Sequence, residues 1–454
     1  MYREICVTCA IALWVTATPT AFAAATLDRR SSETEGTYAI SLGDSYISGE
    51  AGFWKGIVGR DGNTANADDG TEDGTDNSNN DETVMDFASV YGDTWVGGCH
   101  RSDSAEINGA RKSQSEGELV DEVVNLACSG AETRHVLNDA FKDQGKSQVE
   151  LMADEIERQG NKKLKAVVVS IGGNDLDLST LLTNCGKDWV LGDLGVLTDC
   201  TSYKNLEEWV KGKLGNEHGL VKEGVGSLNE EIHNVITKVK VELRKHPNSK
   251  NARIIIQSYP NPFPSTLQGA DGQTDIRVKN NYARYFGCGV PANDETIQFF
   301  RDTNVRIRDA IRLAAQKERI SFLDLLDTFN GHEVCSRHDK ATPSGADDNG
   351  AQVEWVRGVD NAIKDGIANN LIGQRVYANL IQEAAHPNYY GQLALQSCLK
   401  DLMLNAVDEE KDGEMLPRPI AGMCRAGTGK APNEAKVFPN FYQDWPEKIE
   451  EPPL

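Results

Sequence analysis

A serine and a histidine, far apart in the chain, have the chemistry of a nucleophile and its general base. Ser45 ends a Gly-Asp-Ser tripeptide that directly follows the apolar run 38–42. His386 precedes a proline that suits the first turn of a helix. A serine hydroxyl becomes a nucleophile when a base reaches it and when hydrogen-bond donors await the oxyanion. The tripeptide alone means little, because Gly-Asp-Ser also occurs by chance in turns.

Two further segments offer donors for an oxyanion. Gly130 lies in a turn of small residues, Ala-Cys-Ser-Gly-Ala, after a second apolar run. Asn174 ends the segment Ser-Ile-Gly-Gly-Asn after a third run and supplies a carboxamide. Together with Ser45 and His386, these groups provide a nucleophile, a base, a backbone donor and a side-chain donor.

The runs that precede these residues are apolar or β-branched throughout, which suits strands buried on both faces of a parallel sheet. They cover residues 38–42, 123–127, 166–171, 253–258 and 320–323. Helical patterns cover residues 147–158, 225–245, 296–317 and 389–406. Strands that alternate with helices predict a doubly wound α/β sheet, with a mixed α+β domain as the alternative. Ligands bind such a sheet at the carboxyl ends of its strands.

In this order, the four segments resemble the signature blocks of the SGNH (GDSL-type) hydrolases. The variants Gly-Asp-Ser-Tyr-Ile-Ser-Gly from Gly43, Cys-His-Arg-Ser from Cys99 and Ala-Cys-Ser-Gly-Ala from Ala127 are most similar to the secreted actinobacterial lipase, esterase and phospholipase branch. The resemblance spans roughly residues 37–400, with the long loops unaligned. It implies a flavodoxin-like sheet flanked by helices, with long loop insertions, and cleavage of carboxylic esters without a cofactor.

The resemblance also implies a role for each site residue. Ser45 matches the nucleophile, and its own amide joins Gly130 and Asn174 in the oxyanion hole. His386 matches the general base, which later protonates the leaving alcohol. The family usually has an aspartate three residues before this histidine, where the present chain has Glu383. Glu383 could complete a triad, or a backbone carbonyl could replace it in a Ser-His dyad.

The first residues and the cysteines predict export. The apolar stretch 5–17 is too short to span a bilayer, and the Ala-Phe-Ala that ends at residue 23 fits a cleavage site, so residues 1–23 are expected to be a signal peptide. An even number of cysteines remains, which is typical of disulfides in an exported chain. The resemblance implies the pairs Cys99–Cys128, Cys185–Cys200 and Cys288–Cys335, which leaves Cys398–Cys424.

Residues 24–405 are expected to form the catalytic domain, and residues 406–454 an irregular tail packed on it. The segment 61–82 has eight acidic residues and no Lys or Arg, so it should be a solvated loop. A calcium site there is the alternative, but the bidentate glutamate of an EF-hand is missing. With 69 acidic against 47 basic residues, the net charge is −22, which disfavours nucleic acid and anionic membrane surfaces as partners.

We therefore expect a secreted, monomeric ester hydrolase of the lipase, esterase or phospholipase type, with an ester substrate, no membrane anchor, no cofactor and no metal. A carbohydrate O-acetylesterase would use the same four groups and is the first alternative. A catalytically idle binding protein is disfavoured because all four groups are present. A metal-dependent hydrolase around His332 and His338 is the weakest alternative, since no CxxC or HExxH motif accompanies them.

Overall fold

The structure is a computed structural model that describes part of the chain. The described residues are 36–55, 58–59, 87–112, 119–176, 227–264, 294–334, 350–351, 353–358, 382–411, 414–427, 429–439, 441–442 and 445. The segments predicted as a signal peptide (1–23) and as an acidic loop (61–82) lie outside these ranges. So do four of the predicted disulfide cysteines, namely Cys185, Cys200, Cys288 and Cys335.

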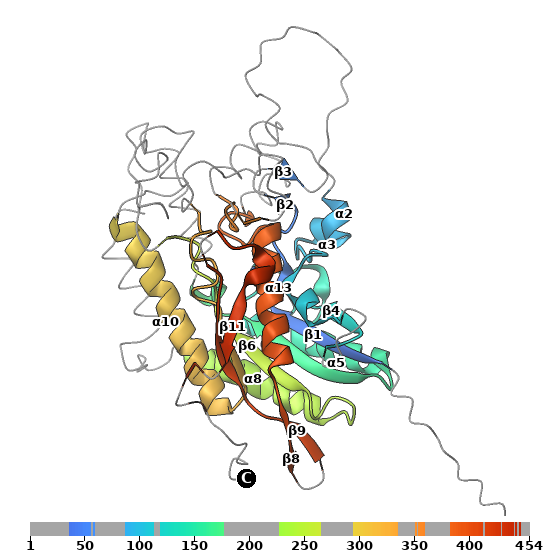
Figure 1. Ribbon diagram of the computed structural model, residues 1–454. Coiled ribbons are helices and arrows are strands. Elements are labelled where there is room, and N and C mark those ends of the chain that lie inside the picture. The colour runs from blue at the N-terminus through green and yellow to red at the C-terminus, as the bar shows by residue number, and fades with distance from the viewer. Residues whose placement is uncertain are drawn as a thin grey trace, which may run out of the picture. The chain divides into compact units, whose positions relative to one another are not determined.

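A seven-stranded sheet, with strands in the order β11-β10-β7-β6-β5-β1-β4, forms the centre of the described fold (Figure 1). The strands are β1 (Thr37–Gly43), β4 (Glu122–Asn125), β5 (Lys163–Ser170), β6 (Arg253–Gln257), β7 (Ser321–Asp324), β10 (Ala421–Arg425) and β11 (Lys436–Pro439). All neighbours pair in parallel except β10 and β11, which are antiparallel. The five strands predicted from apolar runs are confirmed as β1, β4, β5, β6 and β7.

The order of these five strands is that of a flavodoxin-like sheet. Counted along the chain, they lie in the order 2-1-3-4-5, so the chain reverses its direction of winding beside β1. The predicted α/β fold class is therefore confirmed. Ligands bind such sheets at the reversal point, outside the carboxyl ends of the strands. Ser45 follows β1 and Asn174 follows β5, the two strands that adjoin there.

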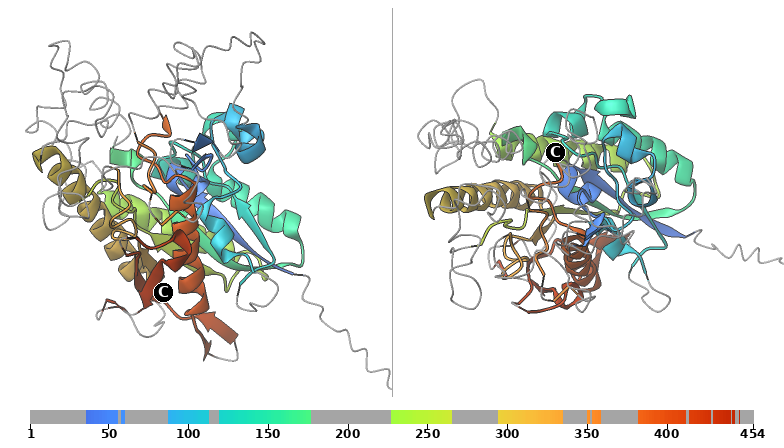
Figure 2. Two further views of the ribbon diagram at one scale, coloured as in Figure 1. Left: turned by 45° about the horizontal axis from the view of Figure 1, so that its top comes forward. Right: turned by 90° about the horizontal axis from the view of Figure 1, so that it is seen from above.

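Helices cover both faces of the sheet. On one face α5 (Gln148–Gln159), α8 (Leu228–Arg244) and α10 (Asp294–Glu318) pack over a hydrophobic cluster that includes Ile40 and Val167. On the other face α13 (Tyr389–Leu404) packs over a cluster that includes Ala39 and Val168. Neighbouring residues of one strand thus belong to opposite clusters, as the period of two in a strand requires. Figure 2 shows α8 and α13 on opposite sides of the sheet.

The helices begin where side chains can accept from their free N–H groups. Ser147 and Glu150 form a capping box at the start of α5, and Ser227 caps α8. Asn388 caps α13, and its Oδ1 accepts from the N–H groups of Tyr390 and Gly391 at 3.0 and 3.1 Å. The predicted helices are confirmed to within a few residues at each end.

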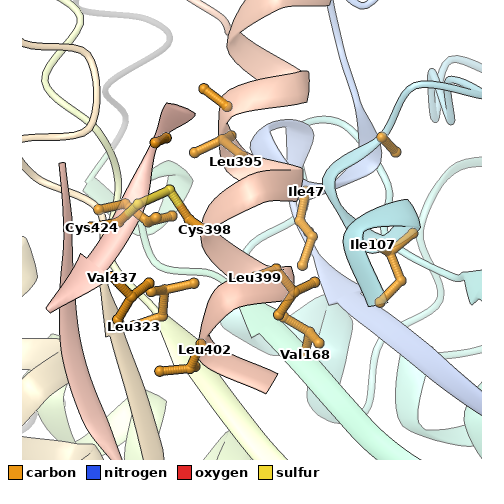
Figure 3. Packing of buried hydrophobic residues seen from close by; sticks show 14 of the residues in the cluster. Ile47, Ile107, Val168, Leu323, Leu395, Cys398, Leu399, Leu402, Cys424 and Val437 are labelled. Atoms are coloured by element: carbon orange, nitrogen blue, oxygen red, sulfur yellow. A yellow bond between two sulfur atoms is a disulfide. The ribbon is translucent and has the colours of Figure 1, made fainter. Parts of the chain in front are cut away.

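The segment after residue 406 is not the irregular tail that the sequence predicts. It contains the hairpin of β8 (Asp408–Lys411) and β9 (Glu414–Pro417), followed by β10 and β11, which widen the main sheet. The disulfide Cys398–Cys424 joins α13 to β10, as Figure 3 shows. Three leucines of α13, Leu395, Leu399 and Leu402, pack in the same cluster.

The remaining elements are short. They are α1 (Ser45–Ser48), β2 (Trp54–Lys55), β3 (Val58–Gly59), α2 (Ala88–Tyr91), α3 (Thr94–Gly97), η1 (Glu106–Ala110), α4 (Thr133–Leu137), η2 (Lys142–Gln144), η3 (Asn174–Leu176) and η6 (Pro432–Glu434). A third cluster, which we call the aromatic cluster, comprises Ala51, Phe53, Trp54, Phe87, Val90, Tyr91 and Trp95. Among the described residues, no helix combines the length and the hydropathy needed to cross a membrane.

Candidate active site

Ser45, the candidate nucleophile, is the first residue of α1 and lies two residues beyond the end of β1. The turn between them is tight, because the N–H of Asp44 donates to the carbonyl of Ser170 at 3.0 Å. A Cβ at Gly43, whose φ is +135°, would lie 1.9 Å from that carbonyl oxygen, so only glycine fits there. Asp44 then caps α1 by accepting from the N–H of Tyr46 at 3.2 Å.

His386, the candidate base, is in direct contact with Ser45. Its Nε2 lies 2.6 Å from Ser45 Oγ, and its Nδ1 lies 3.0 Å from the carbonyl oxygen of Ala384. A carbonyl can only accept, so Nδ1 carries the hydrogen and Nε2 is left to accept the serine proton. Burial lowers the pKa of His386, which favours the neutral form that a base requires.

Contacts from two sides hold the loop that carries His386. The hydroxyl of Tyr46 donates to the carbonyl of Ala385 at 2.8 Å. Arg357 pairs with the loop through its main chain: its N–H donates to the carbonyl of His386, and its carbonyl accepts from the N–H of Ala385, both at 2.8 Å. Ala385 has a φ of +62°, a left-handed conformation that this network maintains. Tyr46, the neighbour of Ser45, thus couples the nucleophile to the loop of the base.

The structure places the Glu383 carboxylate away from the His386 ring, so of the two alternatives that the sequence left open its geometry favours the dyad. The Glu383 carboxylate is fully buried and accepts from Trp54 Nε1 at 2.6 Å and from the Tyr91 hydroxyl at 2.9 Å. Both donors belong to the aromatic cluster, so the carboxylate is turned towards that cluster while Ala384 supplies the acceptor for the ring. Burial raises the pKa of Glu383 to about 7, although the charge of Arg357 lowers it.

The three predicted oxyanion donors come from three different turns. Ser45 starts α1, Gly130 follows β4 with a φ of +82°, and Asn174 starts η3. Asn174 Nδ2 donates to the carbonyl of Ala131 at 3.0 Å, which joins the turn after β4 to the turn after β5. Within the described part of the chain, the N–H groups of Ser45 and Gly130 have no hydrogen-bond acceptor. These donors are therefore available for an oxyanion.

Tyr259 is a site residue that the sequence does not reveal. Its hydroxyl donates to Asp44 Oδ2 and accepts from the N–H of Gly173 at 3.1 Å. It therefore connects the turn that carries Ser45 to the turn that carries Asn174. Burial raises the pKa of Asp44 to about 7 and that of Tyr259 well above its usual value. In the sequence, Tyr259 directly follows the fourth apolar run, but no motif there distinguishes it from an ordinary tyrosine.

A buried acid–base pair lies beside the turn that carries Gly130. Glu50 and His100 are both fully buried, and His100 Nδ1 lies 2.7 Å from Glu50 Oε1. Although burial alone would raise the pKa of Glu50, the charge of His100 lowers it to about 2. Burial lowers the pKa of His100, but Glu50 has the larger combined effect and raises it. The other carboxylate oxygen accepts from the hydroxyl of Ser129.

The disulfide Cys99–Cys128 is present next to this pair, as the resemblance implied. It joins the segment that contains His100 to the turn that contains Gly130. The N–H of Ser129 also donates to the carbonyl of Cys99 at 3.1 Å. The backbone of this turn is therefore fixed both covalently and by hydrogen bonds.

His332, named in the metal alternative, is part of the packing. Its ring stacks on Trp355 at 3.8 Å between centroids, and its Nδ1 donates to the carbonyl of Val353 at 2.9 Å. His338 lies outside the described residues. Over the described ranges, no cluster of three His, Cys, Asp or Glu side chains could hold a metal ion.

The sequence model of the GDSL-like lipase/acylhydrolase family matches residues 90–393, about two thirds of the chain. The match begins after Ser45, so only the structure relates that serine to the matched segment. No curated protein matches the chain significantly.

Two solved structures are similar to this one. The extracellular lipase of Streptomyces rimosus has 16% sequence identity and a TM-score of 0.40, over 78% of this chain and 94% of that one. Phospholipase A1 of Streptomyces albidoflavus has 17% identity and a TM-score of 0.41, over 79% of this chain and 94% of that one. On the strength of the family match, the chain belongs to the GDSL-like lipase/acylhydrolase family.

Proposed function

We propose that this protein is a secreted serine hydrolase that cleaves carboxylic esters of the lipid or short acyl type through an acyl-enzyme on Ser45. Membership of the family makes it an ester hydrolase. The observation that carries the mechanism is the contact of 2.6 Å between Ser45 Oγ and His386 Nε2. It is the geometry in which a general base can take the proton from a nucleophile.

In the first half of the reaction, Ser45 Oγ attacks the ester carbonyl while its proton passes to His386 Nε2. The imidazolium that forms keeps its other proton on Nδ1, which donates to the carbonyl of Ala384. The oxyanion accepts from the N–H groups of Ser45 and Gly130 and from the free N–H of the Asn174 amide. As the tetrahedral intermediate collapses, His386 gives its proton to the departing alcohol.

In the second half, water takes the place of the alcohol. His386 accepts a proton from the water as it attacks the acyl group on Ser45. His386 then returns this proton to Ser45 Oγ as the acid leaves. Because the acceptor for Nδ1 is a carbonyl, we propose that the enzyme works as a Ser-His dyad. Glu383 then serves the packing of the aromatic cluster rather than the reaction.

Secretion is supported by two independent features. Residues 1–23 have the pattern of a signal peptide. The described residues include the disulfides Cys99–Cys128 and Cys398–Cys424, and disulfides persist mainly in oxidising compartments. We propose that the mature protein begins after residue 23 and that its catalytic domain is extended by the strands after residue 406.

The test is a substrate panel with the purified mature protein. Esters of p-nitrophenol with acyl chains of increasing length, phospholipid vesicles and an acetylated glycan distinguish esterase, phospholipase and deacetylase activity. Ser45→Ala should lower kcat by roughly 10⁴-fold or more with an unchanged melting temperature, because the serine contributes little packing. Activity close to wild type in that variant would overturn the assignment of Ser45 as the nucleophile. Activity on the acetylated glycan alone would show that the substrates are acetylated carbohydrates rather than lipid or short acyl esters.

A further inference from the structure

One peptide group of the site is held at its carbonyl end by a side chain that the mechanism above does not use. It is the peptide between Ser129 and Gly130, whose N–H is a proposed oxyanion donor. Its carbonyl, which belongs to Ser129, accepts a hydrogen bond from Lys142 Nζ at 2.6 Å. The same ammonium donates to the carbonyl of Gly98, so it bridges the two segments that the disulfide Cys99–Cys128 also joins.

Lys142 occupies a backbone position that favours glycine. Its φ is +49°, in the left-handed region where a residue with a side chain is strained. The partner Gly98 leaves room for the ammonium, because a Cβ there would lie 3.3 Å from Lys142 Nζ. A strained lysine whose ammonium binds two carbonyls indicates that the side chain has a use that outweighs the backbone strain.

The rest of Ser129 is fixed as well. Its N–H donates to the carbonyl of Cys99 at 3.1 Å, and its hydroxyl donates to the Glu50 carboxylate. With Lys142 bound to its carbonyl, each polar group of Ser129 (the N–H, the hydroxyl and the carbonyl) has a hydrogen-bond partner. Because a trans peptide is planar, fixing the carbonyl oxygen of Ser129 also fixes the direction of the N–H of Gly130.

We propose that Lys142 is a positioning residue of the oxyanion hole. Its ammonium holds the Ser129–Gly130 peptide in place and polarises it, which makes the N–H of Gly130 a stronger donor to the oxyanion. Hydrogen bonds to charged groups are stronger than those between neutral groups, and a bond at one end of a peptide strengthens the bond at the other. The inference rests on the proposed function, since it needs Gly130 to face the oxyanion.

The expected effect is smaller than the loss of a donor. Deleting one oxyanion donor lowers kcat by roughly 10²–10³-fold, whereas loss of Lys142 leaves the N–H of Gly130 in the chain. We therefore expect kcat to fall by about tenfold, with KM within about twofold, because the interaction strengthens only as the oxyanion forms.

Lys142→Gly gives the sharpest test, since it removes the ammonium and also relieves the backbone strain. The melting temperature should stay the same or rise while kcat falls, a combination that a purely structural role does not produce. Lys142→Met should lower kcat to a similar extent, and Lys142→Arg should restore most of it. Lys146→Met is the matched control, because Lys146 is an exposed lysine paired with Asp154 at 2.6 Å. It should leave kcat unchanged.

A second measurement uses a trifluoromethyl ketone with the acyl chain of the substrate. Ser45 Oγ adds to its carbonyl carbon, the proton passes to His386, and a tetrahedral oxyanion remains bound. The inhibition constant of Lys142→Gly should rise by the same factor as kcat/KM falls. All rates are divided by the fraction of sites that react with a fluorophosphonate, so that unfolded protein cannot imitate the effect.

Full kcat in Lys142→Gly, or a loss that Lys142→Arg does not restore, would overturn the inference. The proposed function would still stand if the wild-type protein hydrolyses esters and Ser45→Ala does not. If Ser45→Ala is as active as the wild type, the proposed function fails, and the role of Lys142 fails with it.

Discussion

Replacing Glu383 by glutamine separates a role in catalysis from a role in holding the fold. The carboxylate accepts from Trp54 Nε1 and from the Tyr91 hydroxyl, while the His386 ring is held by the carbonyl of Ala384. We therefore expect Glu383→Gln to keep kcat within about threefold of the wild type, since the tautomer is set elsewhere. The new amide presents N–H groups to one of the two donors, and losing that bond should cost about 1–3 kcal/mol of unfolding free energy.

The stability of this variant relative to the wild type should also depend on pH. Burial raises the pKa of Glu383 from 4.5 to about 7. A carboxyl group with a raised pKa stabilises the folded state fully below pH 4.5 and loses that contribution as the pH rises through 7. The difference between the two pKa values corresponds to roughly 3 kcal/mol. Glutamine does not titrate, so the stability deficit of Glu383→Gln should shrink by about that amount between pH 4 and pH 9.

Urea unfolding followed by tryptophan fluorescence at several pH values measures the stability, and p-nitrophenyl ester hydrolysis measures kcat. Glu333→Gln is the matched control, because Glu333 is also buried and burial raises its pKa to about 7. It accepts from the N–H of Gly331 at 2.7 Å and makes no contact with Trp54 or Tyr91 that the structure describes. A kcat lower by orders of magnitude in Glu383→Gln alone, at native stability, would refute the reasoning and restore the triad.

Asn174→Ala should lower kcat by roughly 10²–10³-fold with little change in KM, and steady-state kinetics on protein with an unchanged melting temperature would show it. A change confined to KM would count against an oxyanion role. The acid limb of kcat/KM should have its midpoint below pH 6.5, because burial lowers the pKa of His386; a pH profile with a higher midpoint would contradict this. Burial also raises the pKa of Glu106 to about 8, so its stabilising contribution is full below pH 4.5 and is lost as the pH rises through 8. At pH 9 Glu106→Gln should therefore have a higher free energy of unfolding than the wild type, by several kcal/mol at most, and should unfold at a higher urea concentration. Equal stability at that pH would argue against a buried ionising group.

The strands and the order of the site segments could be predicted because each has a local cause. A buried parallel strand such as β5 is a continuous apolar run, and a site at its carboxyl end must be carried by the residues that follow it. Ser45 and Asn174 are of this kind, whereas His386 is marked by the proline after it, which suits the first turn of a helix. The structure adds the distance between Ser45 and His386, which no pattern along the chain specifies.

The parts that could not be predicted depend on contacts between distant segments. Spacing places Glu383 three residues before His386, but the side chain turns towards Trp54, 329 residues away in the chain. Tyr259 and Glu50 join the site in the same manner, through partners that lie far from them in the sequence. The strands after residue 406 were hidden because they are short, and because the pairing of β10 with β7 lies outside any local pattern.

The carbonyl of Ala384 has a consequence for how the enzyme can change over time. Every amino acid carries a main-chain carbonyl, so no point mutation at position 384 can delete the group that orients His386. A carbonyl also does not titrate, so this orientation is the same in acid and in alkaline surroundings. In the proposed dyad, position 383 has no part in catalysis, so its side chain is free to evolve with the aromatic cluster that it contacts.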